Sequence, residues 1–336
     1  MKPVFDRYGD EAEFAVQAVR QAGRLCLAIE EARHRDPWLK DDRSPVTLAD
    51  FASQALVASG LEAAFPADPL VAEEDSARLR QGAARELLAR LREHVAQFVD
   101  GASVAAILHW IDRGAGELAE RFWTLDPVDG TKGLLRGGQY AVALGLIEHS
   151  RVEVGALACP HLDLGLGGGS VVVGVRGQGA WAAPLSGGTF VRLRVSRRTA
   201  PSRMRLLRSV EADHTDVAKL DRIVARLGLR QEPIRMDSQA KYALLAAGQA
   251  ELIVRLVSPQ RPEYCERIWD QAAGSLLVEE AGGTVSDLRG RRLDFGRGRE
   301  LRGNLGVLAS NGRVHAAALE AIRAVGADRR PGEVAS

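Results

Sequence analysis

The chain of 336 residues has few cysteines, and they are poorly placed for pairing. Cys26, Cys159 and Cys265 lie far apart and form no C-x-x-C pair. An odd and sparse set of this kind argues against a disulfide framework and favours a reducing compartment. Cys159 and the nearby His161 could be imagined as zinc ligands, but two ligands without a second pair are a poor basis for a zinc site.

The sequence also lacks an excess of charge of either sign and has no long hydrophobic run. Its 45 Lys and Arg residues balance 44 Asp and Glu residues, so the formal net charge is +1. Proteins that bind nucleic acid or anionic membranes usually carry a basic excess, because they neutralise phosphates. No stretch approaches the ~18 apolar residues of a membrane span, and the acidic start, which has few apolar residues, does not have the pattern expected of a signal peptide. We therefore expect a cytoplasmic protein that binds neither nucleic acid nor a membrane.

Lysine is scarce among the basic residues. The five lysines are Lys2, Lys40, Lys132, Lys219 and Lys241, and all other basic residues are arginine. A lysine retained against this bias draws attention, and two of the five lie beside the candidate chemistry described below. The 46% of hydrophobic and 26% of charged residues are those of an ordinary globular protein.

The first half of the chain has the pattern of helices followed by a sheet. Apolar residues at helical spacing predict helices over 10–33 and 47–64, with Thr47 as the N-cap of the second. A charge-laced segment predicts a third helix over 76–98. From Phe122, short apolar runs separated by glycines predict successive strands, and hence a largely antiparallel sheet.

In the second half, strand and helix patterns alternate. Helices are predicted over 215–228, 238–248, 270–281 and 312–324. Such alternation is typical of an α/β unit, and a chain of this length tends to split into two packed parts. We therefore expect an α/β fold with an α+β subdomain over 1–200, an α/β subdomain over 201–326 and a polar tail over 327–336.

The most informative segment is L-D-P-V-D-G-T, which follows an apolar strand. Asp126 and Asp129 lie on one tight turn, where their carboxylates and the Val128 carbonyl can converge on a hard cation such as Mg²⁺. Gly130 and Thr131 then begin a helix, whose first backbone N–H groups favour a phosphate. A D-x-x-D pair alone would more simply cap a helix, but the complete string predicts a metal and a phosphate site side by side.

Further acidic residues occur in three other segments. Glu73 and Glu74 follow a short apolar run, so one of them can point inward beside Asp126. Asp50 lies within an apolar helix, and Asp270 stands at the start of a helix. Each also has a simpler explanation, as a solvated loop, an exposed helix face or an N-cap. Together they predict a carboxylate cage for two or three divalent ions that hold a phosphate.

With these segments in place, the chain resembles the lithium-sensitive, magnesium-dependent phosphomonoesterases that include inositol monophosphatase and fructose-1,6-bisphosphatase. The resemblance rests on the paired glutamates, L-D-P-V-D-G-T, and W-D-Q-A-A-G followed by E-A-G-G, in the family's order over residues 40 to 310. It implies a layered α-β-α-β-α sandwich. Within the family the likeness is strongest to 3′(2′),5′-bisphosphate nucleotidases, through D-R-S-P-V-T-L-A-D, D-G-T-K-G-L-L-R-G-G-Q-Y-A-V, V-R-G-Q-G-A and D-S-Q-A-K-Y-A-L-L-A-A-G.

The resemblance implies a role for each matched residue. A first Mg²⁺ would be held by Glu73, Asp126 and the Val128 carbonyl, and a second by Asp126, Asp129 and Asp270. Asp50 and Thr131 would orient and deprotonate the attacking water, aided by a third ion near Glu73. The nucleotide would be bound by His214, Ser238, Lys241 and Arg255, of which the last two neutralise the 5′-phosphate. The implied reaction converts adenosine 3′,5′-bisphosphate to AMP and phosphate.

Two other functions remain open at this point. The metal residues suit a phosphatase for inositol phosphate or a sugar bisphosphate equally well, and only K-G-L-L-R-G and D-S-Q-A-K favour the nucleotide. A non-catalytic nucleotide-binding protein would lack at least one metal carboxylate or Thr131, and all are present. Whether the chain is a monomer or a homodimer also stays open.

Departures from the family pattern are few. Ala72 stands where a glycine usually precedes the glutamates, and Gln271 where histidine is common, but neither position supplies a side-chain metal ligand. The G-L-G-G-G run at 165–169 is not followed by a helix with Lys-Ser/Thr, so it is not a P-loop.

Overall fold

The computed structural model describes residues 2–35, 48–81, 84–210 and 215–331. Its three cysteines are free, as the sequence predicts. Within the described residues, no helix is both long and apolar enough to cross a membrane.

Two long helices cover one face of the first sheet. They are α1 (Gly9–Arg35) and α2 (Leu48–Ala64), which confirm the first two predicted helices. Thr47, the predicted N-cap, lies outside the described residues. α2 is buried over most of its length because it packs against both α1 and the first sheet. Asp50 is therefore buried with it.

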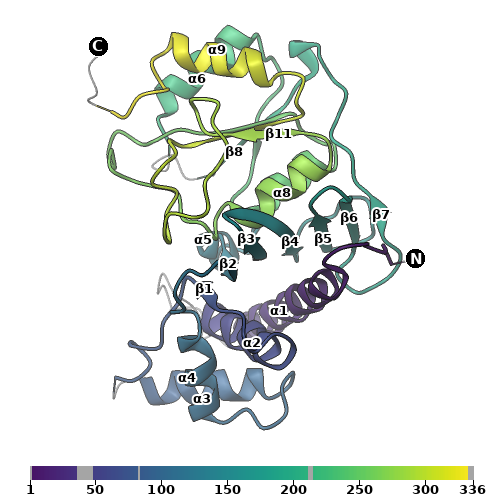
Figure 1. The fold of residues 1–336 in the computed structure, drawn as a ribbon, viewed down its shortest axis with the longest axis vertical. Helices are drawn as coiled ribbons and strands as arrows, with labels where there is room; N and C mark the ends of the chain where they lie inside the picture. The colour runs from purple at the N-terminus through teal and green to yellow at the C-terminus, as the bar shows by residue number, and fades with distance from the viewer. Residues whose placement is uncertain (1, 36–47, 82–83, 211–214, 332–336) are drawn as a thin grey trace.

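A smaller helical pair lies beyond α2 (Figure 1). It consists of α3 (Arg85–Val95) and α4 (Val104–Asp112). The helix predicted over 76–98 is wrong in its extent: residues 76–81 form turns, in which the Ser76 carbonyl accepts from the Leu79 amide. The sequence reading missed α4, although its N-cap Ser103 accepts a hydrogen bond from the Ala106 amide at 3.1 Å.

The first sheet has seven strands in the order β1-β2-β3-β4-β5-β6-β7. They are β1 (Leu70–Ala72), β2 (Arg121–Asp129), β3 (Ala141–Glu148), β4 (Arg151–Cys159), β5 (Ser170–Val175), β6 (Gly179–Pro184) and β7 (Val191–Arg192). All neighbours pair antiparallel except β1 and β2, which confirms a largely antiparallel sheet. Because β1 and β2 are parallel, both run toward the same edge, with Ala72 opposite Leu125.

The second sheet has five strands in the order β11-β12-β10-β8-β9. They are β8 (Leu206–Arg208), β9 (Ile234–Arg235), β10 (Leu252–Arg255), β11 (Thr284–Ser286) and β12 (Val307–Ser310). Between them the chain forms α6 (Val217–Leu227), α7 (Ala240–Ala246), α8 (Ala272–Glu280) and α9 (His315–Ala324). The predicted alternation is confirmed, and β11 is an additional short strand.

The elements stack in five layers (Figure 1). α1 and α2 lie under the first sheet, α8 lies between the two sheets, and α6 and α9 cover the outer face of the second sheet. This confirms the expected α-β-α-β-α sandwich. The division near residue 200 stays a prediction. The first residue of the expected polar tail, Ala327, is 5% exposed and belongs to the apolar cluster that contains Ala321 and Ile322 of α9.

Candidate active site

The site begins at the edge where β1 and β2 end together. Glu73 follows β1, and Asp126 lies on β2 one position beyond the Leu125 that pairs with Ala72. Asp126 is 3% exposed. Between Asp126 and Asp129 the register with β3 shifts, because Pro127 cannot continue the ladder. Two acidic side chains from distant segments are thereby brought to one edge.

The turn after Asp126 is held by hydrogen bonds from both sides. Asp126 Oδ1 accepts from the Val128 amide at 3.1 Å. From α2, the Ser53 hydroxyl donates to the Pro127 carbonyl at 2.8 Å. Since Ser53 and Asp50 are one turn apart on α2, the same helix that supports the turn also brings Asp50 to it.

Gly130 and Thr131 lie where the sequence predicts them. Gly130 has φ of +91° and precedes α5 (Thr131–Leu135). A Cβ there would lie 3.1 Å from that of Ser238, so glycine meets both a backbone and a space requirement. The Thr131 hydroxyl lies 3.2 Å from Asp50 Oδ1 and 3.1 Å from the Val128 carbonyl. Asp50 is 1% exposed, so the exposed-face explanation does not hold.

One residue that the sequence reading passed over, Gln239, joins the two halves of the site. Its backbone N–H donates to Asp129 Oδ2 at 2.7 Å, and its side-chain Nε2 donates to the Trp269 carbonyl at 2.8 Å. Its Oε1 accepts from the Gly274 amide at 3.0 Å. Asp129 is thereby linked to the residue before Asp270 and to α8. In the sequence, Gln239 was indicated only as a member of the D-S-Q-A-K string at 237–241.

Asp270 precedes α8, but it does not cap that helix. The N-cap position is Gln271, without a side-chain capping hydrogen bond. Burial raises the pKa of Asp270 well above its ordinary value, and the neighbouring Asp129 carboxylate adds to the effect. The N-cap explanation for Asp270 is therefore wrong, and its side chain belongs with the other carboxylates.

These carboxylates destabilise one another as anions. Burial, followed by the charges of Glu73 and Asp129, raises the pKa of Asp126 well above its ordinary value. Burial also raises the pKa of Asp129, although Lys241 opposes the shift. Glu73 is an exposed residue, yet the loss of hydration at its carboxyl group and the Asp50 charge raise its pKa to about 7. Such a set is stabilised by a cation placed among its members.

Glu74 lies on the other side of Glu73. Burial, then the charge of Asp50, raises the pKa of Glu74 to about 8. The buried Gln54 side chain holds the Glu74 backbone at both ends: its Nε2 donates to the Glu74 carbonyl at 2.7 Å, and its Oε1 accepts from the Glu74 amide at 3.1 Å. Of the two glutamates, Glu73 is the one that acts directly on Asp126.

The donor set fits a hard divalent ion in its chemistry. It consists of carboxylate oxygens and one backbone carbonyl, the ligands that Mg²⁺ prefers. In the described part of the chain, no three acidic, histidine or cysteine side chains already converge closely enough to hold a metal ion. The carboxylates are therefore repelling neighbours, and an ion would have to draw them inward.

The predicted nucleotide residues border the carboxylates. Ser238 has a left-handed backbone with φ of +67° and is buried. Lys241 is 2% exposed, and its Nζ donates to the Met236 carbonyl at 3.3 Å. Burial, then the charge of Arg255, lowers the pKa of Lys241 to about 8. His214 lies outside the described residues.

Arg255 has a partner that the sequence reading missed. Its Nε lies 3.1 Å from Glu266 Oε1, and its Nη2 lies 2.7 Å from Glu266 Oε2. Burial alone would lower the pKa of Arg255, but the Glu266 charge outweighs it and raises the pKa. Gln271 donates to Glu266 Oε2 at 2.7 Å and accepts from the Tyr242 hydroxyl. Gln271, which departs from the family pattern, thus helps to hold Arg255.

The chain matches a known family over most of its length. The sequence profile of the Inositol monophosphatase family matches residues 10–327. A 3′(2′),5′-bisphosphate nucleotidase of Schizosaccharomyces pombe is 38% identical, over 94% of this chain and 95% of the relative. A 3′(2′),5′-bisphosphate nucleotidase of Oryza sativa is 39% identical, over 94% of each chain.

Solved structures agree on the fold. An inositol monophosphatase from Thermotoga maritima superposes with a TM-score of 0.64 at 19% identity, covering 94% of this chain and 98% of that one. The bacterial family member CysQ from Bacteroides thetaiotaomicron superposes with a TM-score of 0.61 at 19% identity, covering 91% of this chain and 99% of that one. The chain is therefore a phosphatase that belongs to the inositol monophosphatase family.

Proposed function

We propose that the chain is a Mg²⁺-dependent phosphomonoesterase that removes the 3′-phosphate of adenosine 3′,5′-bisphosphate to give AMP. The observation that carries this substrate is the cationic pair of the buried Lys241 and the partly buried Arg255 beside the carboxylate cluster. A substrate with a second phosphate, which is not cleaved, needs such a pair. The names of the relatives support the same substrate.

Glu73, Asp126, the Val128 carbonyl, Asp129 and Asp270 would hold two to three Mg²⁺ ions. When bound, such ions supply Lewis-acid stabilisation of the charge on the phosphate and on the leaving oxygen. The chain's own part is to place oxygen donors from the first sheet and from the segment before α8 around that phosphate.

Asp50 and Thr131 act on the attacking water. Thr131 orients the water through its hydroxyl, and Asp50, hydrogen-bonded to that hydroxyl at 3.2 Å, accepts the proton. The water oxygen attacks phosphorus, the bond between phosphorus and the 3′-oxygen breaks, and the 3′-oxygen leaves with a proton from solvent. The buried setting of Asp50 excludes competing water from its far side.

The remaining residues bind the substrate. The backbone N–H groups of Gly130 and Thr131 hold the phosphate that is cleaved. Ser238, Lys241 and Arg255 hold the second phosphate, and His214 contributes to nucleotide binding. The sulfated analogue, 3′-phosphoadenylyl sulfate, is a second expected substrate, because its sulfate lies beyond the 5′-phosphate. Nucleic acid and membranes are not expected partners of this site.

The first test compares substrates side by side. Phosphate release is measured with Mg²⁺ and adenosine 3′,5′-bisphosphate, inositol 1-phosphate or fructose 1,6-bisphosphate. We expect kcat/KM to be at least about tenfold higher for the nucleotide, the equivalent of ~1.4 kcal/mol in the transition state. A preference for either other substrate would remove the nucleotide assignment and leave the family membership intact.

A further inference from the structure

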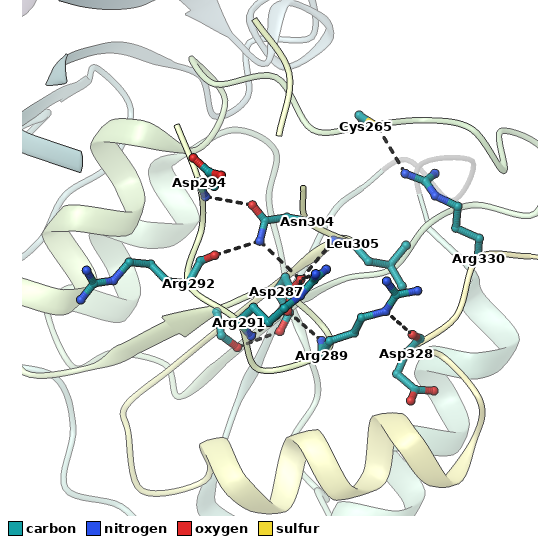
Figure 2. Close-up of polar contacts among 11 residues, drawn as sticks. Cys265, Asp287, Arg289, Arg291, Arg292, Asp294, Asn304, Leu305, Asp328 and Arg330 are labelled. Carbon is teal, nitrogen blue, oxygen red and sulfur yellow. Dashed lines mark hydrogen bonds and ion pairs between the residues drawn. The ribbon is translucent and has the colours of Figure 1, made fainter. Parts of the chain in front are cut away.

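Side-chain hydrogen bonds hold the base of the long segment between β11 and β12 (Figure 2). The buried Asp287 accepts from the Arg289 amide at 2.9 Å and from the Arg291 amide at 2.8 Å. The Asn304 side chain joins the two ends of the segment: its Oδ1 accepts from the Asp294 amide and its Nδ2 donates to the Arg292 carbonyl, each at 2.9 Å. The segment is therefore a loop with a rigid base, although it contains little regular structure.

The tip of this loop runs along the segment that leads to Asp270. The Ile268 amide donates to the Arg299 carbonyl at 3.1 Å, and the Leu301 amide donates to the Glu266 carbonyl at 2.8 Å. This short ribbon places Arg299 next to Trp269. A side chain from a far part of the loop therefore reaches the candidate active site.

The Arg299 guanidinium crosses from the second sheet to the first. It lies over the Trp269 ring, 4.9 Å from the centroid. One nitrogen donates to the Gly114 carbonyl at 3.3 Å, and the other donates to the Ala72 carbonyl. The Gly114 carbonyl also accepts from the Ala72 amide at 2.8 Å, so one contact falls on the last residue of β1 and the other on the carbonyl bound to that residue. Ala72 is followed directly by Glu73.

We propose that Arg299 is a positioning residue for the metal ligands. One guanidinium holds the backbone that carries Glu73 and the aromatic ring that precedes Asp270, and thereby sets the separation of these two carboxylates. A planar fork of donors can reach two carbonyls while it stacks on a ring, which an ammonium group cannot do. The proposal rests on the proposed function, because it takes Glu73 and Asp270 as ligands.

The test measures metal binding directly. Mn²⁺ is titrated into the metal-free full-length protein, and the bound fraction is followed by electron paramagnetic resonance without substrate. In Arg299→Met the dissociation constant should rise about tenfold, since loss of a residue that orients ligands commonly costs 10–100-fold in metal affinity. Arg299→Lys keeps the charge but can reach only one of the two carbonyls, so its affinity for Mn²⁺ should fall about threefold.

A matched control comes from the same loop. Arg302 is 73% exposed and pairs with Glu300 within the loop, so Arg302→Met should bind Mn²⁺ like the unchanged protein. Asp270→Asn serves as the direct ligand variant. If the unchanged protein binds no Mn²⁺, or Asp270→Asn binds it normally, the proposed function fails.

Three further results would overturn the positioning role alone. The first is Mn²⁺ affinity within about twofold of the unchanged protein in a folded Arg299→Met variant. The second is equal losses in Arg302→Met and Arg299→Met. The third is that both Arg299 variants unfold before metal is added, because Arg299 would then only stabilise the fold.

Discussion

At the scale of single residues, the site is built from groups that oppose folding. Asp50, Asp126, Asp129 and Asp270 are buried or enclosed close to one another, and a buried charge without a partner costs free energy. Lys241 and Arg255 offset part of this cost at Asp129. These two cations are fewer than the four carboxylates, so negative charge remains that metal ions can neutralise.

A histidine that pairs with a buried acid, away from the proposed ligands, makes stability depend on pH. His161 Nε2 lies 2.8 Å from Glu30 Oε2, and this hydrogen bond raises the pKa of His161 although partial burial opposes it. Because the folded pKa exceeds the unfolded value, the stabilisation is present below that unfolded value and is lost as the pH rises through the folded pKa.

We therefore predict that His161→Gln lowers the free energy of unfolding by about 1 kcal/mol near pH 5.5. The difference from the unchanged protein should shrink by about pH 8.5, where the histidine is neutral in both states. Urea unfolding at the two pH values measures it. His149→Gln is the control, because its pair with Glu120 is largely exposed. A larger loss at high pH would contradict the prediction.

At the scale of elements, α8 lies unusually close to the first sheet. A Cβ on Gly155 of β4 would lie 3.0 Å from the Cα and the carbonyl oxygen of Ala273, and one on Gly145 of β3 would lie 3.2 Å from the Cβ of Ala272. Both contacts fall on the first turn of α8, which begins after Asp270 and the N-cap Gln271. The two glycines thus let this helix carry Asp270 down to the edge of the sheet.

Gly155→Ala should accordingly destabilise the protein by about 1–3 kcal/mol, because backbone atoms of α8 cannot move aside easily. Denaturant unfolding measures the change. Gly9→Ala is the control, since a Cβ there meets no atom within 4 Å. Equal stability of Gly155→Ala and the unchanged protein would show that α8 can shift on the sheet without cost.

At the scale of the whole molecule, the proposed ligands come from the first sheet and from the segment that leads into α8. Glu73 and Asp126 belong to the first sheet, and Asp270 precedes a helix between the sheets. A metal bound by all three is bound only in the folded chain, so it must stabilise the stacked arrangement by mass action.

Mg²⁺ at about 100 times its dissociation constant should raise the free energy of unfolding by ~2.7 kcal/mol. In Asp126→Asn this gain and the turnover should both be lost. The metal-free variant should be no less stable than the unchanged protein, because one repelling carboxylate is gone. Thermal unfolding with Mg²⁺ and with a chelator measures both effects. An equal gain in the two proteins would contradict the assignment of Asp126.

Local order along the chain was predictable wherever a short pattern carries it. The apolar spacing of residues 10–33 predicts α1, and the glycine-separated runs from Phe122 predict an antiparallel sheet. The start of α3 was not predictable, because charged residues continue the helical pattern through 76–81 while the buried Leu79 is held in turns.

The sequence by itself determined that the oxygen donors of the candidate site lie together: Asp126, Val128, Asp129 and Thr131 are within six residues, where spacing alone brings them close. Tertiary structure decided which other residues join them. The chain separation between Ala72 and Arg299 is 227 residues, and Arg299 binds backbone carbonyls there and at Gly114. Every residue has a backbone carbonyl, so the residue types of Ala72 and Gly114 do not indicate that an arginine binds them. Only the stacking of the two sheets selects it.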